Sequence, residues 1–309
     1  MTLLGCRSNI KNIKFLGEAM NSIGEVYLET YTIGGFSIHY LHDMDSLQKN
    51  SIRYVATVEY DGSFFYGWQK QKELATVQYV LENALSKVGN NNINVVGAGR
   101  TDTGVHALQQ VAHFESINVR APLSWLRGAN TLLPKAVSIL SVSEVLPEFH
   151  ARFTAVGRTY RYIVLNRSVA PTYLHRRVTW DYRTLDIYRM REAAKYLIGE
   201  HDFNAYRATS CQSKSSVRNL RKLEISSKDE WIWFDVEAGS FLHHMVRNLV
   251  GVLLSIGAGE EKPIWAKTVL ESRNRGAGGV TADPDGLYLV SVAYPSKYNI
   301  PCGTNVRFW

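Results

Sequence analysis

The sequence predicts an α+β fold built from two halves that each combine sheet and helix. Segments rich in β-branched and aromatic residues alternate with segments of helical period between residues 52 and 294. A connector at residues 147–153 separates a strand–helix–strand–strand–helix–strand run from a second run with a similar alternation. Apolar residues make up 45% of the 309-residue chain, which is enough to build a core. We therefore expect one half at residues 51–150 and a second at 151–298.

The first half contains four expected strands and two expected helices. The strands are expected at residues 52–60, 94–96, 110–114 and 137–145. The helices are expected at residues 77–88 and 122–133. Thr76 is the expected N-cap of the first helix. Pro122 begins the second helix and Pro134 ends it, because proline fits the first helical position and cannot continue a helix.

The second half follows with a similar alternation of strands and helices. Strand residues are expected at 160–165, around 225, at 231–238 and at 287–294. Helices are expected at 184–198, 242–256 and 263–270. The helix at 242–256 is strongly apolar but carries His243, His244 and Arg247. Neighbouring residues on a helix point about 100° apart. We therefore expect the two histidines to serve packing, and we expect no metal site.

The two ends of the chain differ from its middle. Residues 1–50 show no clear helix or strand period, so we expect a leader that is disordered or that reflects the choice of start site, with Met20 and Met44 as alternative starts. Residues 299–309 form an expected tail. The three cysteines are far apart and form no CxxC pair, which favours a reducing, cytoplasmic location. No apolar run of ~18 residues is present, so we expect no membrane span.

Basic residues gather in one part of the sequence. The chain carries a formal charge of +7, but residues 152–222 hold fifteen arginines and lysines against five acidic residues. Arginine outnumbers lysine there, and tyrosines and a tryptophan are interleaved with the basic residues. Arginine suits phosphate recognition and base stacking. The pattern indicates a polyanionic partner, with a solvated surface as the alternative.

The most unusual stretch is the glycine-rich segment 97–107, with sequence GAGRTDTGVHA. Glycines at this density allow a tight turn and a close approach to a ligand. The hydroxyls of Thr101 and Thr103 flank Asp102 and are expected to fix its carboxylate. Arg100 is close enough in sequence to hold that carboxylate ionised. The third glycine and the following helix of a dinucleotide site are missing, so a Rossmann site is excluded.

Further short motifs follow one another from about residue 52 to residue 295. They are EYDG at 59–62 with GWQ at 67–69, AGRTD at 98–102 with GVH at 104–106, FHARF at 149–153, YRY at 160–162, GEHDF at 199–203, CQS at 211–213, HHMVRN at 243–248 and GLYL at 286–289. With these motifs the sequence resembles the TruA-type tRNA pseudouridine synthase family. The resemblance implies a pseudouridine synthase-like fold, in which both halves share a mostly antiparallel sheet with a cleft between them. It also implies a homodimer that isomerises uridines 38, 39 and 40 of the tRNA anticodon arm.

The resemblance also implies roles for particular residues. Asp102 would be the nucleophile, with Arg100 and Tyr160 as its catalytic neighbours. Contacts with tRNA are implied for Tyr160, Arg120, Phe149, His150, Ala151, Arg152, Phe153, Ser210, Cys211, Gln212, Ser213, Lys214 and Arg247. No cofactor is expected, because isomerisation involves no net redox change.

The chemistry of uridine isomerisation agrees with this set. Breaking the glycosidic bond builds positive charge at the sugar, which a carboxylate can stabilise or trap. The sequence leaves open whether Asp102 attacks the sugar, attacks the base or removes a sugar proton. The target base must leave the helical stack, at a cost of a few kcal/mol. Arg100 can fill the vacated space, and Tyr160 can stack on the uracil.

Two other functional classes stay open at this point. A non-catalytic RNA-binding protein with this fold would have no use for the Arg100–Asp102 pair. A metal-dependent phosphotransfer enzyme could use Asp102 together with Asp61, but it would need further clustered carboxylates that the sequence does not offer.

Overall fold

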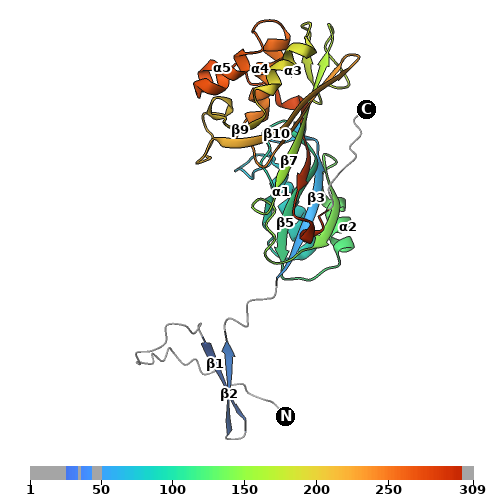
Figure 1. Ribbon diagram of the computed structural model, residues 1–309. Helices are drawn as coiled ribbons and strands as arrows, with labels where there is room; N and C mark the ends of the chain where they lie inside the picture. The colour runs from blue at the N-terminus through green and yellow to red at the C-terminus, as the bar shows by residue number, and fades with distance from the viewer. Residues whose placement is uncertain (1–25, 34–35, 44–50, 301–309) are drawn as a thin grey trace, which may run out of the picture. The chain divides into compact units, whose positions relative to one another are not determined.

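The computed structural model describes residues 26–33, 36–43 and 51–300, and the chain divides into two compact units, residues 1–50 and 51–309. In the first unit, β1 (Val26–Ile33) and β2 (Phe36–Asp43) form an antiparallel hairpin (Figure 1). No strand was expected there. The other residues of the expected leader, and most of the expected tail, lie outside the described residues.

The second unit is organised around one ten-stranded sheet with the order β6-β3-β5-β12-β7-β11-β10-β9, in which β4 pairs with β5 and β8 pairs with β7. Its strands are β3 (Ile52–Tyr60), β4 (Val95–Gly97), β5 (His106–Ser116), β6 (Val137–Glu144), β7 (Gly157–Asn166), β8 (Thr179–Asp181), β9 (Gly199–Asp202), β10 (Val217–Lys228), β11 (Trp231–Ala238) and β12 (Leu287–Ala293). Within this sheet only the β5–β12 and β7–β8 pairs are parallel. The expected α+β fold with a mostly antiparallel sheet is confirmed.

The last strand, β12, joins the two halves. It lies between β5 of the first half and β7 of the second, so that Tyr288 pairs with His106 and Leu289 pairs with Tyr160. The central strand β7 is buried on both faces. Tyr162 contributes to the main core and Ile163 to a smaller core on the other side. The shared sheet holds residues of both halves in a fixed relation around these central strands.

Helices pack separately on each half of the second unit. They are α1 (Val77–Gly89), α2 (Pro122–Leu132), α3 (Ile187–Lys195), α4 (Met245–Gly257) and α5 (Trp265–Ser272). The first two contact each other, and α3 contacts both α4 and β10 (Figure 1). Trp125 of α2 is fully buried against the rings of Tyr54 and Phe114. Each half thus has its own helical cover over the common sheet.

Several local expectations differ from the structure. Thr76 stands at the N-cap of α1, but its hydroxyl caps no backbone N–H and is buried without a hydrogen-bond partner. The expected helix at 242–256 begins only at Met245, so His243 and His244 precede it. The short strands β8 and β9 were not predicted, because three or four residues carry too little periodicity. Within the described ranges, no helix has the length and apolar character required to cross a bilayer.

Candidate active site

The loop between β4 and β5 presents Asp102 and is held mainly through its backbone. The side-chain amide of Gln110 donates to the Gly99 carbonyl at 2.8 Å, and the backbone N–H of Trp68 donates to the Thr101 carbonyl at 3.0 Å. Gly104 has a φ of +84°, a conformation that favours glycine. These contacts fix the position of the Asp102 backbone without using its side chain.

The buried Arg158 links this loop to the second half of the chain. Its guanidinium donates to the carbonyls of Ala98 and Arg152, each at 2.8 Å, and to the Gly239 carbonyl at 2.6 Å. Burial lowers the pKa of Arg158. No sequence pattern predicts this role, because the carbonyls of Ala98 and Gly239 lie 60 and 81 residues away along the chain. Arg158 therefore ties the Asp102 loop to the expected tRNA-contacting segment.

The Asp61–Gly62 turn supports the other side of the loop. The Gly62 N–H donates to His106 Nδ1 at 3.1 Å, and Asp61 pairs with Arg177 at 2.9 Å. A Cβ on Gly62 would lie 2.0 Å from the Val105 carbonyl oxygen. The backbone segments are therefore packed so closely that only glycine fits.

We expect Gly62→Ala to lower the free energy of unfolding by ~1–3 kcal/mol, because overpacking forces the Val105 backbone to move. Turnover should fall as well, since Val105 is three residues from Asp102. Thermal unfolding and single-turnover rates measure the two effects. Gly278→Ala is the control, because a Cβ there meets its nearest atoms at 3.4 Å in an extended backbone. Equal stability of both variants would contradict the prediction.

The threonines beside Asp102 do not hold its carboxylate as expected. The Thr101 hydroxyl is buried and forms a hydrogen bond with the Tyr60 hydroxyl at 2.8 Å. Thr103 is exposed. The expectation that these two hydroxyls fix the Asp102 carboxylate is therefore wrong, because Thr101 is turned into the core and Thr103, at a turn, faces solvent.

Three basic side chains from the start of α4 surround the Asp102 carboxylate instead. Arg247 Nη1 donates to Asp102 Oδ2 at 3.1 Å. His243 Nε2 lies 3.2 Å from Oδ1, and His244 Nε2 lies 3.4 Å from Oδ2. Arg247 is itself fixed, because its Nε donates to the Ala282 carbonyl at 2.8 Å. The site is therefore assembled from a loop of the first half and a helix N-terminus of the second.

The backbone at His244 explains how both imidazoles reach one carboxylate. His244 has a φ of +61° and lies outside α4, so the 100° helical spacing does not apply to this pair. The ring centroids of His243 and His244 are 4.1 Å apart. The expectation that these histidines diverge is wrong. The HHMVRN motif was the one feature of the sequence that pointed to these histidines, but helical periodicity could not predict the left-handed backbone at His244.

The electrostatics of the cluster favour an ionised Asp102. Burial alone would raise the pKa of Asp102, but the hydrogen bond with His243 and the charges of His244 and Arg247 outweigh burial and lower it. The same hydrogen bond raises the pKa of His243, whereas burial lowers the pKa of His244. A carboxylate that is only 20% exposed is thus kept negatively charged.

Arg100 does not pair with Asp102 in this structure. Its side chain is exposed, and within the described residues it has no hydrogen bond or ion pair. The expected electrostatic partner of Asp102 is therefore corrected from Arg100 to Arg247. Arg100 stands on the same loop, two residues from Asp102, with its guanidinium available to another molecule.

Tyr160 of β7 lies beside the same loop. It is 8% exposed and packs edge-on against Phe241 at 5.1 Å between centroids. Burial raises the pKa of Tyr160 to about 12, and the nearby Asp102 charge acts in the same direction. A Cβ on Gly99 would meet only the Tyr160 hydroxyl, at 3.9 Å. The absent side chain of Gly99 therefore leaves space between Tyr160 and the loop.

The segment expected to contact tRNA is divided between core and surface. Phe149 and Ala151 are fully buried, so we assign them to packing. Phe153 is 75% exposed, stacks on the His150 ring at 4.3 Å between centroids and lies 5.6 Å from the Arg152 guanidinium. Arg152 and Phe153 are exposed and His150 is half-buried, and the three form one aromatic and basic surface.

The remaining expected contacts lie in two further loops. The Ser210 hydroxyl lies 3.3 Å from His243 Nδ1, which brings the loop 210–214 against the Asp102 cluster. Gln212 and Lys214 are exposed, whereas Cys211 and Ser213 are half-buried. Arg120 is exposed and is anchored by its backbone, whose carbonyl accepts a hydrogen bond from the Tyr54 hydroxyl at 3.0 Å.

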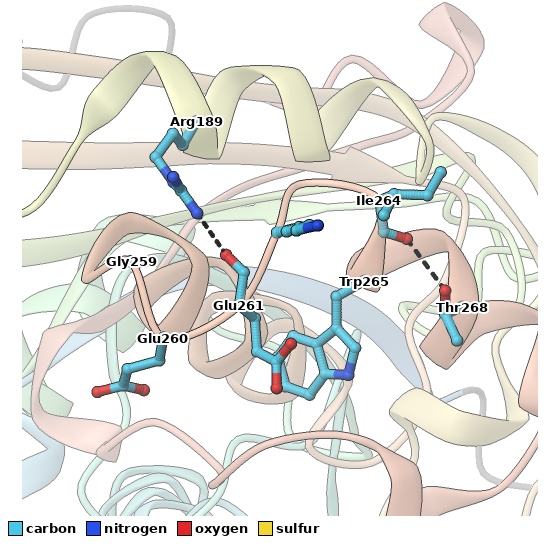
Figure 2. A pocket seen from close by; sticks show the side chains of 8 residues that line it. Arg189, Gly259, Glu260, Glu261, Ile264, Trp265 and Thr268 are labelled. Atoms are coloured by element: carbon cyan, nitrogen blue, oxygen red, sulfur yellow. Dashed lines mark hydrogen bonds between the residues drawn. The ribbon is translucent and has the colours of Figure 1, made fainter.

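An open pocket lies elsewhere, between α3 and the start of α5 (Figure 2). Arg189 spans it and donates to the Glu261 carbonyl at 2.7 Å, with Trp265 and Thr268 on the opposite side. It shares no lining residue with the Asp102 cluster. Its Arg189 donates to backbone carbonyls, and its Glu260 pairs with Arg183, so we take the Asp102 cluster as the functional site.

Comparison with known proteins shows which family the chain is similar to. A family model described as tRNA pseudouridine synthase matches residues 56–154 and 193–295. A "tRNA pseudouridine synthase A" of Nitrosococcus oceani is 51% identical over 250 residues, which cover 81% of this chain and 96% of the relative. Proteins of the same name from Methylococcus capsulatus and Coxiella burnetii are each 48% identical, over 81% and 79% of this chain and 92% and 94% of theirs.

Proposed function

The chain belongs to the tRNA pseudouridine synthase family, and we propose that it isomerises uridines 38, 39 and 40 of the tRNA anticodon arm with Asp102 as nucleophile. The protein is a tRNA pseudouridine synthase, an isomerase. The observation that carries the role of Asp102 is its ionised carboxylate, held by Arg247 on an anchored loop.

The reaction moves one glycosidic bond and one proton. The C1′–N1 bond breaks, the uracil rotates, and a C1′–C5 bond forms. The proton at C5 then leaves, and N1 gains a proton, so that no atom is lost overall. The negative charge of Asp102 is suited to trap or stabilise the electron-poor intermediate. Arg247 and His243 keep that charge in place before the substrate arrives.

The space beside Gly99 is the proposed position of the flipped uracil. This space is bordered by the Tyr160 hydroxyl. A tyrosine phenol is neutral at physiological pH, and burial raises the pKa of Tyr160 further. A neutral phenol can stack on the base and form a hydrogen bond without adding charge. A base in this space would lie within reach of Asp102, because Gly99 and Asp102 belong to the same loop.

Arg100 is proposed to fill the gap that the flipped base leaves. The exposed guanidinium has no partner in the described structure, and Arg247 already neutralises Asp102. We expect Arg100→Lys to bind tRNA normally but to lose turnover rate by about tenfold or more, because lysine lacks the planar stacking surface. Single-turnover rates on paired and unpaired target uridines measure the effect. The defect should shrink on the unpaired target, and an equal loss on both would contradict base flipping.

The surface of His150, Arg152 and Phe153 is proposed to bind the tRNA backbone. We expect Arg152→Ala to weaken binding and to reduce the salt dependence of log K by about one unit of slope or less. Filter-binding titrations at several salt concentrations measure both quantities. Lys228→Ala is the control. Lys228 lies at the end of β10, five residues from Leu223, the β10 residue that lines up with Tyr160 across the sheet. Unchanged affinity and slope in Arg152→Ala would remove this residue from the interface.

We also propose that the enzyme is a homodimer of the cytoplasm whose tRNA lies in a cleft between the two halves. The dimer and the cleft follow from the family resemblance, and the location follows from a tRNA substrate. Sedimentation equilibrium tests the dimer directly.

The test of the whole proposal is chemical mapping of pseudouridine in tRNA. Unmodified tRNA transcripts are incubated with the enzyme, and modified positions are read by carbodiimide labelling and primer extension. Pseudouridine at positions 38, 39 or 40 supports the proposal. Modification confined to other positions would contradict it.

A further inference from the structure

The Asp102 cluster, which consists of Asp102, His243, His244 and Arg247, includes side chains that can also bind a metal ion. One ligand atom from each of Asp102, His243 and His244 lies within 4.8 Å of the other two. Two imidazole nitrogens and one carboxylate oxygen are typical ligands of Zn²⁺ and related ions. No other group of this kind occurs in the described part of the chain.

The distances in the cluster are close to those of a metal coordination shell. Ligand bonds of about 2.0–2.1 Å in a tetrahedral site place neighbouring ligand atoms about 3.3 Å apart. Asp102 Oδ1 lies 3.2 Å from His243 Nε2, and Oδ2 lies 3.4 Å from His244 Nε2. The two contacts use different oxygens of the carboxylate, so the rings must close on one oxygen for all three donors to share an ion; one atom of each already lies within 4.8 Å of the others.

The orientation of the rings and the access to the site also suit an ion. The Nε2 atom of each ring faces the carboxylate. His243 Nδ1 meets the Ser210 hydroxyl at 3.3 Å, as the second nitrogen of a ligating histidine commonly meets a polar partner. His243 is 42% exposed, so an ion can enter from solvent and a fourth ligand position stays open to water.

One group opposes cation binding. The Arg247 guanidinium lies 3.1 Å from Asp102 Oδ2 and repels a cation at that oxygen. It leaves Oδ1, the oxygen nearer to His243, as the better ligand atom. The site should therefore be weaker than a structural zinc site, so that occupancy follows the concentration of the free ion.

We propose that a divalent transition-metal ion, best matched by Zn²⁺, binds reversibly to Asp102, His243 and His244 and inhibits the enzyme. The bound ion takes up the carboxylate lone pair that the reaction requires and occupies the approach to the sugar. The inhibition rests on the proposed role of Asp102, whereas the binding rests on the geometry of the cluster alone.

The binding test uses the full-length enzyme with Cys6, Cys211 and Cys302 replaced by serine, so that thiols do not bind the ion. Zn²⁺ is titrated by equilibrium dialysis, and Co²⁺ reports coordination through its visible absorption. We expect one equivalent of Zn²⁺ per chain and a tetrahedral Co²⁺ spectrum. His243→Ala and His244→Ala should each lose both signals. The control is His201→Ala, whose histidine contacts the Ile198 carbonyl away from the cluster, and it should keep them.

The inhibition test measures tritium release from C5-labelled tRNA at increasing Zn²⁺, followed by addition of chelator. We expect a loss of at least tenfold that tracks the occupancy of the site and is reversed by chelator. Absence of stoichiometric binding, or binding that survives both histidine substitutions, overturns the site. Binding without inhibition overturns the inhibitory role. Zn²⁺ binding by a protein that releases no tritium even without the ion would instead count against the proposed function and leave the site in place.

Discussion

Asp102→Asn is expected to reduce turnover at least about 10³-fold while leaving tRNA affinity nearly unchanged. Asparagine keeps the shape of the side chain but cannot act as a nucleophile or carry the negative charge. The anchors of the loop, from Gln110, Trp68 and Arg158, bind backbone atoms and are retained. Single-turnover kinetics and filter binding measure the two effects.

The same variant has a spectroscopic consequence that does not depend on catalysis. Asp102 raises the pKa of His243 through their hydrogen bond, so this pKa should fall when the carboxylate is removed. NMR titration of the His243 ring measures the change. Asp186→Asn is the control, because Asp186 is an N-cap of α3 and asparagine caps equally well. Residual turnover near the wild-type level, or an unchanged His243 pKa, would remove Asp102 from its assigned role.

Arg247→Met is expected to lower turnover by about 10²-fold or more, as does the loss of a preorganised charged donor at other active sites. The guanidinium is 14% exposed and lowers the pKa of Asp102, so its removal should raise that pKa. Because the reaction needs the ionised carboxylate, the loss of activity on the acidic side should begin at higher pH than in the wild type.

A pH–rate profile in single turnover measures this shift. Arg247→Lys should recover part of the rate, because it keeps the charge but loses the hydrogen bond to Ala282. Arg189→Met is the control, since Arg189 also binds backbone carbonyls but lies away from Asp102. An acidic limb unchanged in Arg247→Met would show that Arg247 does not control the ionisation of Asp102.

Local patterns in the sequence predicted most of the fold. Strand β3 follows from its β-branched and aromatic residues. Helix α1 follows from its apolar period and its end at Gly89–Asn90, and helix α2 follows from Pro122 at its start. The central position of β12 was not predictable in this way, because it depends on pairing between strands about 180 residues apart. The resemblance to a family supplied the shared sheet that local periodicity could not.

The candidate site was predicted in part. The roles of Asp102 and Tyr160 stay predictions; Asp102 lies on the loop between β4 and β5, and Tyr160 of β7 lies beside that loop. The pairing of Asp102 with Arg100 was wrong, because a neighbour in sequence was preferred to Arg247, which lies 145 residues away. The histidines were misplaced for a local reason, since a single left-handed residue at His244 ended the helical geometry assumed for them.

The most direct test of the central claim is tritium release from tRNA labelled at C5 of uridine. The wild-type enzyme should release tritium in step with pseudouridine formation, with no added cofactor and in the presence of EDTA, and Asp102→Asn should release none. Absence of release from tRNA that the enzyme binds, or release that EDTA abolishes, would contradict the account.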